Sequence, residues 1–88
     1  MSKPIESLPN IGPELAASLR FAGVNSAEDL IALGATAVWR RLVRAGILAD
    51  IQSLYLLDGA ASGVRWDEMS FQRKQELRQF AVAYSQGV

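Results

Sequence analysis

The stretch from Leu8 to Val24, LPNIGPELAASLRFAGV, constrains the fold more than any other part of the sequence. Pro13 stands where the first residue of a helix belongs, because its missing N–H costs nothing there and its fixed φ suits the helix. Apolar residues then recur at the spacing of one helical face, at Leu15, Leu19 and Ala22. Gly23 is the glycine expected after a helix C-terminus. These signals predict a turn, with Gly12 supplying the freedom to turn, and a helix from Pro13 to Ala22.

Part of this stretch, LPNIGPELAASL, resembles the second half of a helix-hairpin-helix motif. In that family the hairpin and the helix start hold a nucleic-acid phosphate through backbone N–H groups, which point outward from the positive end of the helix. The resemblance implies phosphate contacts at the four hairpin residues, Asn10, Ile11, Gly12 and Pro13. Two features depart from the motif: Asn10 replaces the first glycine, and Glu14 repels phosphate. A phosphate-binding hairpin and a turn that only packs both remain open, and the residues favour the second.

Composition predicts an all-α fold. Half of the 88 residues are apolar and few are aromatic. Helix formers dominate, and the alternation of β-branched residues typical of strands is absent. The rest of the chain is divided by the expected N-caps Ser26, Asp50 and Ser70 and by terminal glycines. These signals predict helices at 26–33, 35–45, 51–62 and 71–85. We therefore expect residues 1–88 to form one domain, a compact bundle of about five short helices with a helix-hairpin-helix-like N-terminal part.

Several functional classes are disfavoured by residue counts. Nine basic and nine acidic residues cancel, which argues against strong non-specific binding to nucleic acid or to an anionic membrane. The chain has neither cysteine nor histidine, so thiolate chemistry and histidine-based catalysis or metal binding are excluded. No phosphate-binding loop or calcium-loop pattern occurs. We expect a non-enzymatic protein without cofactor, metal ion or small-molecule substrate.

No targeting or membrane segment is evident in the sequence. The N-terminal residues MSKPIESLPN lack the apolar centre of a signal peptide, and no apolar run is long enough to span a bilayer. The expected location is therefore the cytoplasm, without membrane contact.

One further turn is predicted at 4–8, and in the connection at 64–69 Trp66 is expected to anchor the chain to the core. Leu30 and Leu33 are both expected to face inward.

Two helices carry candidate binding residues. In the helix at 35–45, Arg40, Arg41 and Arg44 lie opposite the apolar face. They form either a solvated face or a patch for phosphate or an acidic partner. The helix at 51–62 is apolar almost all round, which indicates either burial on several sides or a subunit interface. We expect it to form the centre of the bundle. Its polar exception, Asp58, is expected either to be exposed or to meet an arginine. The candidate interface residues are Trp39, Leu54 and Leu57.

Over most of its length the chain resembles the C-terminal domain of the TfoX/Sxy family of competence regulators. The match runs from about Leu8 to Phe80 and rests on the order of short pieces: Asn10-Ile11-Gly12-Pro13, Ala22-Gly23-Val24, Glu28-Asp29-Leu30, Leu33-Gly34-Ala35 and Leu57-Asp58-Gly59-Ala60, with Gly63 and Trp66 following. The resemblance implies a small all-α bacterial domain from regulators of DNA uptake and competence genes. The full regulators place another domain ahead of this one. We expect that domain to be absent here.

Two functional hypotheses follow. The first is a regulatory module that acts through protein–protein contacts, either with an unknown protein or with a second copy of itself. The alternative is a weak nucleic-acid-binding module that uses the Asn10–Pro13 hairpin together with Lys3, with Arg20, or with the basic patch of Arg40, Arg41 and Arg44. The two differ in salt dependence, because phosphate binding weakens steeply as salt rises whereas an apolar interface does not.

Overall fold

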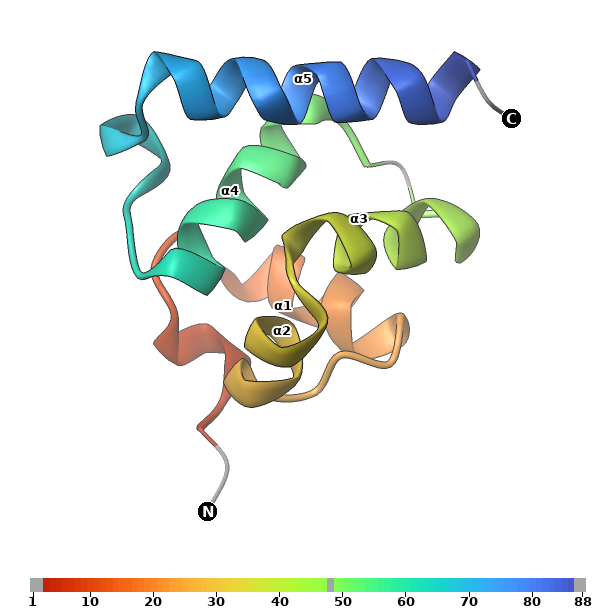
Figure 1. Cartoon of the computed structure of the whole chain (residues 1–88). Coiled ribbons are helices and arrows are strands. Elements are labelled where there is room, and N and C mark those ends of the chain that lie inside the picture. The colour runs from red at the N-terminus through yellow and green to blue at the C-terminus, as the bar shows by residue number, and fades with distance from the viewer. Residues whose placement is uncertain (1–2, 48, 87–88) are drawn as a thin grey trace.

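The computed structural model describes residues 3–47 and 49–86. The secondary structure of these residues consists of helices, without a β-strand (Figure 1). The label η marks a short 3₁₀ helix and the label α an α-helix. The elements in chain order are η1 (Ile5–Ser7), α1 (Pro13–Phe21), α2 (Ala27–Leu33), α3 (Ala35–Arg44), α4 (Ile51–Ser62), η2 (Trp66–Glu68) and α5 (Phe71–Gln86). The predicted all-α bundle of five short helices is confirmed. Each predicted helix corresponds to an observed one, with ends displaced by at most one residue.

Three side chains fix the starts of helices as the sequence predicts. The Ser26 hydroxyl accepts a hydrogen bond from the backbone N–H of Asp29 at 3.1 Å, at the start of α2. The Asp50 carboxylate accepts one from Ser53 N–H at 2.9 Å, at the start of α4. The Ser70 hydroxyl accepts one from Arg73 N–H at 3.1 Å, at the start of α5. Each cap satisfies a backbone donor that has no partner inside the helix, so these boundaries are encoded locally.

The turn before α1 differs from the prediction in the residue that makes it possible. Gly12 has φ −90° and ψ −179°, an extended conformation open to any residue. Asn10 instead adopts the left-handed region, with φ 72°, which asparagine tolerates better than most residues. The conformational freedom assigned to Gly12 is therefore required at Asn10.

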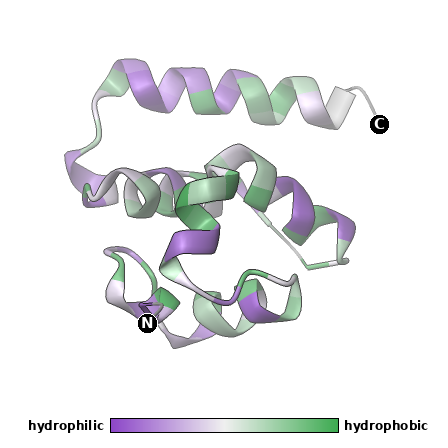
Figure 2. Cartoon of the chain, turned by 60° about the horizontal axis from the view of Figure 1, so that its bottom comes forward, coloured by the Kyte–Doolittle hydropathy of each residue, from purple (hydrophilic) through white to green (hydrophobic). Residues whose placement is uncertain are grey.

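Helix α4 forms the centre of the bundle, and the helices α2, α3 and α5 pack against it. Leu54 and Leu57 are 0% exposed, inside a core that also includes Leu19, Leu30 and Leu42. Helix α5 lies across the remaining helices as a separate layer, in which hydrophilic and hydrophobic residues alternate (Figure 2). A helix that is apolar on all sides needs neighbours on all sides, and α4 has them.

Two predicted core residues are exposed. Leu30 is buried, as predicted, but Leu33 is 38% exposed at the last position of α2. The chain turns away at the next residue, Gly34, whose φ is +86°. Trp66 is also 38% exposed, and its ring lies under the Lys74 ammonium, 5.3 Å from Nζ to the ring centroid. Trp66 therefore contacts α5 through a cation rather than filling the core.

The N-terminal segment is tied to the start of α2. Lys3 O accepts a hydrogen bond from Ala27 N–H at 3.0 Å, and Lys3 N–H donates to the Glu28 carboxylate at 3.1 Å. These contacts hold η1 against α1 and α2, with Ile5 fully buried. Across the described part of the chain, no helix is both long and apolar enough to span a membrane.

Candidate interaction surfaces

The hairpin residue Asn10 is a tertiary clamp. Its side-chain N–H group donates to the carbonyl oxygens of Leu56 at 3.3 Å and Val64 at 2.9 Å. Its side-chain oxygen accepts from Trp66 N–H at 3.0 Å. The amide thus joins the turn before α1 to the end of α4 and to η2. The whole amide is used inside the protein, so the polar part of Asn10 is not directed at an external phosphate.

The other hairpin candidates divide into buried and exposed residues. Ile11 belongs to the core, whereas Gly12 and Pro13 lie at the surface at the start of α1. Glu14, in the first turn of α1, is also exposed. Arg20 pairs with Glu6 across the surface, and its guanidinium hydrogen bond lowers the pKa of the Glu6 carboxyl. The guanidinium of Arg20 thus already has an anionic partner.

The three arginines of α3 form one exposed basic surface, which we call the α3 arginine face: Arg40, Arg41 and Arg44. Val38 and Leu42 are buried on the opposite side of the helix, as predicted. Within the described residues the α3 arginines take part in no ion pair, whereas Arg20, Arg65 and Arg73 each have a carboxylate partner. Positive charge is therefore concentrated on α3, although the chain as a whole is neutral.

Arg41 also has a place within the fold. Its Nη1 lies 3.6 Å from the position that a Cβ on Gly23 would occupy, just beyond the C-terminal end of α1. Cations are favoured there, because the last carbonyl groups of a helix give that end a partial negative charge. Arg41 can therefore stabilise the bundle as well as face a ligand.

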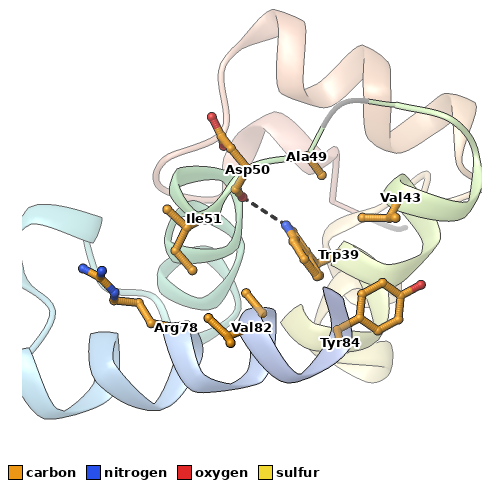
Figure 3. Close-up of a pocket in the computed structure, with 9 residues that line it drawn as sticks. Trp39, Val43, Ala49, Asp50, Ile51, Arg78, Val82 and Tyr84 are labelled. Carbon is orange, nitrogen blue, oxygen red and sulfur yellow. Dashed lines mark hydrogen bonds between the residues drawn. The ribbon is translucent and has the colours of Figure 1, made fainter. Parts of the chain in front are cut away.

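A groove of about 650 Å³ opens between α3, the start of α4 and the C-terminal half of α5 (Figure 3). We call it the α5 groove. Its lining is mainly apolar and comes from Trp39, Val43, Ala49, Asp50, Ile51, Arg78, Ala81, Val82 and Tyr84. Val82 is 55% exposed at its edge. A volume of this size, with apolar walls and few polar groups, is typical of binding sites.

Trp39 forms the inner wall of the α5 groove and is held from two sides. Its indole N–H donates to the carbonyl oxygen of Asp50 at 3.1 Å (Figure 3). Its ring makes edge-to-face contacts with Phe80 and Tyr84, at centroid distances of 6.1 and 5.7 Å. Trp39 is only 4% exposed. It is therefore a core residue that borders the groove and positions α5 over α3.

The predicted interface residues on α4 need correction. Leu54 and Leu57 have no exposed surface in this chain, because α4 is covered by its own neighbours. They hold the core together and offer no surface to a partner. Exposed apolar side chains lie instead on the outer helices, at Phe21, Ile31, Phe71 and Val82.

The charged residues that line the α5 groove differ in their surroundings. The Asp50 carboxylate accepts hydrogen bonds from both the backbone N–H and the hydroxyl of Ser53, at 2.9 Å each. These two hydrogen bonds lower the pKa of Asp50, and the bond from the backbone N–H has the larger effect. Arg78 has no ion-pair partner within the described residues. The groove is therefore mainly apolar, with one carboxylate hydrogen-bonded by Ser53 and, among the described residues that line it, one guanidinium without an ion-pair partner.

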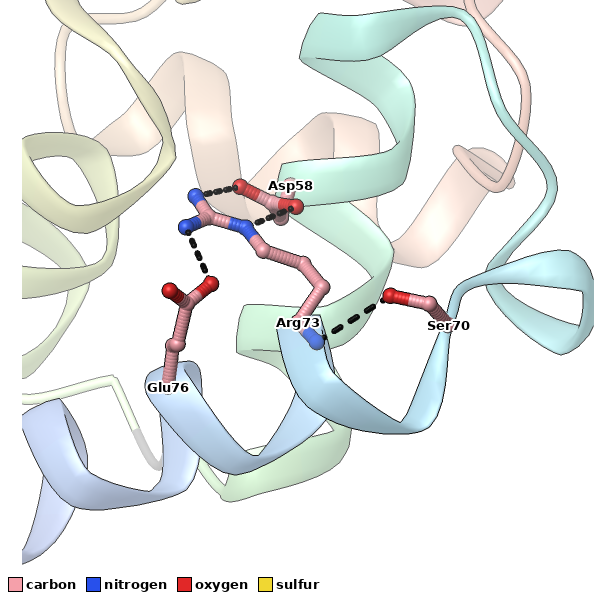
Figure 4. A network of polar contacts seen from close by, with 4 residues as sticks. All are labelled: Asp58, Ser70, Arg73 and Glu76. Carbon is pink, nitrogen blue, oxygen red and sulfur yellow. Dashed lines mark hydrogen bonds and ion pairs between the residues drawn. The ribbon is translucent and has the colours of Figure 1, made fainter.

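An ion-pair cluster fixes α5 to α4. The Arg73 guanidinium donates to the Asp58 carboxylate through Nε at 3.0 Å and Nη2 at 2.6 Å, and Glu76 lies on its other side at 3.4 Å (Figure 4). The hydrogen bonds to Asp58 raise the pKa of Arg73. Of the two environments expected for Asp58, the contact with an arginine is confirmed.

The sequence model of the TfoX C-terminal domain matches residues 1–81. This chain belongs to the TfoX C-terminal domain family. It is also similar to protein Sxy of Escherichia coli K12, with 32% identity over 77 residues, which cover 88% of this chain and 37% of Sxy. The TfoX C-terminal domain described here therefore spans little more than a third of that relative.

Two solved structures share the fold of this TfoX C-terminal domain. Both are described as proteins from Listeria monocytogenes, one uncharacterized and one of unknown function. The triclinic form has a TM-score of 0.88 and 29% identity, covering 93% of each chain. The tetragonal form has a TM-score of 0.86 and 30% identity, covering 91% of this chain and 98% of that one. The arrangement of α5 over the bundle thus has experimental counterparts.

Sequence reasoning missed the α5 side of this TfoX C-terminal domain. Arg78 and Val82 were not among the predicted site residues, although their spacing of four residues places them on one face of the helix. Their neighbours on this face, Gln75 and Gln79, are polar, as is typical of a solvent-exposed helix surface. The groove itself depends on how α5 lies over α3, which no local pattern specifies.

Proposed function

We propose that this domain is a non-enzymatic module of a competence-regulator-like protein and that it acts by binding another protein in the α5 groove. The observation that supports this most directly is the groove itself, an open and mainly apolar surface of about 650 Å³ bordered by Val82 and Ile51. Helix-in-groove recognition uses surfaces of this kind, with apolar anchors supplied by the partner. The family assignment supports the regulatory role, and regulation of genes in a bacterium takes place in the cytoplasm.

Capture from a bacterial extract with matched variants tests this function. We would compare the wild-type chain with Val82→Glu, which places a charge at the edge of the groove. Ile31→Glu is the matched control, because Ile31 and Val82 are both 55% exposed and Ile31 is not among the residues that line the groove. Each variant must first show wild-type helix content by circular dichroism.

The expected result is a protein retained by the wild type and by Ile31→Glu but lost from Val82→Glu. That protein, once purified, must then bind the domain alone in solution. Equal retention by all three chains would remove the α5 groove as the binding surface.

The α3 arginine face supports a second candidate function, weak binding to the nucleic-acid backbone. Three arginines on one helix, without an ion-pair partner in the part of the chain that the structure describes, form a surface complementary to phosphate. The Asn10–Pro13 hairpin contributes less to this candidate, since the Asn10 amide is engaged internally and Glu14 lies in the first turn of α1. Its test is the salt dependence of binding to duplex DNA.

A further inference from the structure

We infer that the protein segment received by the α5 groove is a helix that carries an acidic residue beside its apolar anchors, with the acid placed to meet Arg78. This inference rests on the proposed protein-binding function and specifies the chemistry of the partner. It is supported by the shape of the surface around Arg78 and by the charges present on it.

The surface extends over both sides of α5. A second, shallower hollow of about 340 Å³ is lined by Gln75, Arg78, Gln79, Val82 and Ala83. Arg78 and Val82 line both hollows, so they form a ridge between the groove and its neighbour. A small ligand is usually enclosed on most of its surface, whereas this ridge with a hollow on each side is open. It matches the surface of another helix, whose side-chain rows can lie on either side of the ridge.

The charges on this surface select an acidic partner. Among the described residues, Asp50 is the one acidic residue that lines either hollow, and its carboxylate accepts hydrogen bonds from Ser53. Arg78 is exposed and belongs to none of the ion pairs among the described residues. An apolar contact that covers Arg78 therefore removes from water a cation that has no ion-pair partner among the described residues, and this is unfavourable unless the partner provides an anion.

The same argument disfavours a second copy of this chain as the occupant. A two-fold interface uses the same patch on both subunits. Burying this ridge against itself brings two Arg78 side chains into one contact surface, and the other residues that line the second hollow provide no negative charge. Like charges in a shared interface oppose association. A different protein with a carboxylate at this position removes the conflict.

Two synthetic peptides serve as probes. Both are amphipathic helices of about 16 residues with the same row of leucines at helical spacing. One carries glutamate beside the leucine row, and the other carries lysine at the same positions. The readout is the pair of indole N–H signals in a proton–nitrogen correlation spectrum, because the chain has two tryptophans. Trp39 lines the groove, whereas Trp66 on η2 does not and serves as the internal control.

The glutamate peptide is expected to shift the Trp39 signal, leave the Trp66 signal in place and bind about threefold more tightly than the lysine peptide, the size of an exposed ion pair. Arg78→Glu is expected to reverse this preference. Arg65→Gln, which alters an exposed arginine outside the groove, should leave the preference unchanged.

Equal binding of the two peptides, or a preference that persists in Arg78→Glu, would overturn the inference. The absence of any Trp39 shift with either peptide up to about 1 mM would also overturn the inference. It would mean that the free energy of binding is weaker than about −4 kcal/mol. Equal binding leaves the proposed protein-binding function standing, because an apolar partner without a carboxylate satisfies it. Failure of the capture experiment removes that function itself.

Discussion

The side-chain amide of Asn10 occupies the space that the missing side chain of Gly59 leaves free. A Cβ on Gly59 would lie 2.5 Å from Asn10 Nδ2 and 2.4 Å from the carbonyl oxygen of Val64, the same oxygen that accepts the Asn10 hydrogen bond. The turn before α1 and the end of α4 can therefore meet only when residue 59 has no side chain. This contact holds the turn before α1 against the end of α4.

Replacing Gly59 with alanine should destabilise the fold. Alanine improves helix propensity by up to about 1 kcal/mol, but the added methyl group forces apart a backbone carbonyl and the Asn10 amide. We expect a net loss of about 1–3 kcal/mol in the free energy of unfolding, measured by urea denaturation.

Gly12→Ala provides the matched control for that substitution. A Cβ at Gly12 meets nothing within 4 Å, and φ is −90° there. The loss should stay below about 1 kcal/mol, the usual cost of alanine at a helix N-cap. A Gly59→Ala chain as stable as Gly12→Ala would contradict the contact.

Removing Arg73 should loosen α5 from α4. In Arg73→Gln, the Asp58 carboxylate, whose side chain is only 11% exposed, loses both of its guanidinium hydrogen bonds. Because Arg73 itself is 47% exposed and partly screened by water, we expect a loss of about 1–2 kcal/mol rather than the larger cost of a fully buried pair.

The control for Arg73 is Arg65→Gln, which breaks a pair between exposed side chains. Its effect should be below about 0.5 kcal/mol. Equal losses in the two variants, measured by urea denaturation, would show that the Asp58–Arg73 pair contributes no more than a surface contact.

Much of the fold could be predicted from sequence, because its helix boundaries are set by local chemistry. Ser26, Asp50 and Ser70 accept the capping hydrogen bonds expected of them. The tertiary contacts could not be predicted in the same way. The Asn10 amide bonds Trp66, 56 residues away, and nothing near Asn10 in the sequence indicates that partner. Leu54 and Leu57 were predicted to be interface residues, because the sequence pattern of an apolar helix is the same whether its neighbours lie in the same chain or in another.

Stability should fall in acid partly through Asp50. Hydrogen bonds from Ser53 lower its pKa in the folded state, below the value of about 3.9 in the unfolded chain. The contribution of this carboxylate is therefore present above about pH 4 and is lost as the pH falls through the lowered pKa. Asp50→Asn keeps a capping side chain but removes the titration.

The urea midpoints of the wild type and Asp50→Asn test this account of acid sensitivity. The advantage of the wild type at about pH 6 should shrink at about pH 3. A difference that is the same at both pH values would contradict it.

Binding of duplex DNA should depend on the α3 arginine face if the second candidate function operates. The affinity should then fall steeply between low and moderate salt. The double variant Arg41→Gln/Arg44→Gln should bind more weakly and reduce the slope of log affinity against log salt by about 2.

A control for DNA binding removes the same charge elsewhere. Arg65→Gln/Arg78→Gln alters two exposed arginines outside α3 and should leave the slope nearly unchanged. Fluorescence anisotropy with a labelled duplex measures both variants. Equal slopes in the two double variants would exclude the α3 arginine face as the contact.

The most direct test of the central claim is a calorimetric titration of the domain with the purified protein captured from the extract. The account predicts binding to the wild type and to Ile31→Glu with similar affinity, and at least about tenfold weaker binding to Val82→Glu, as for an anchor at the edge of an apolar site. Equal affinity of Val82→Glu and the wild type would contradict the claim that the α5 groove is the surface on which this domain acts.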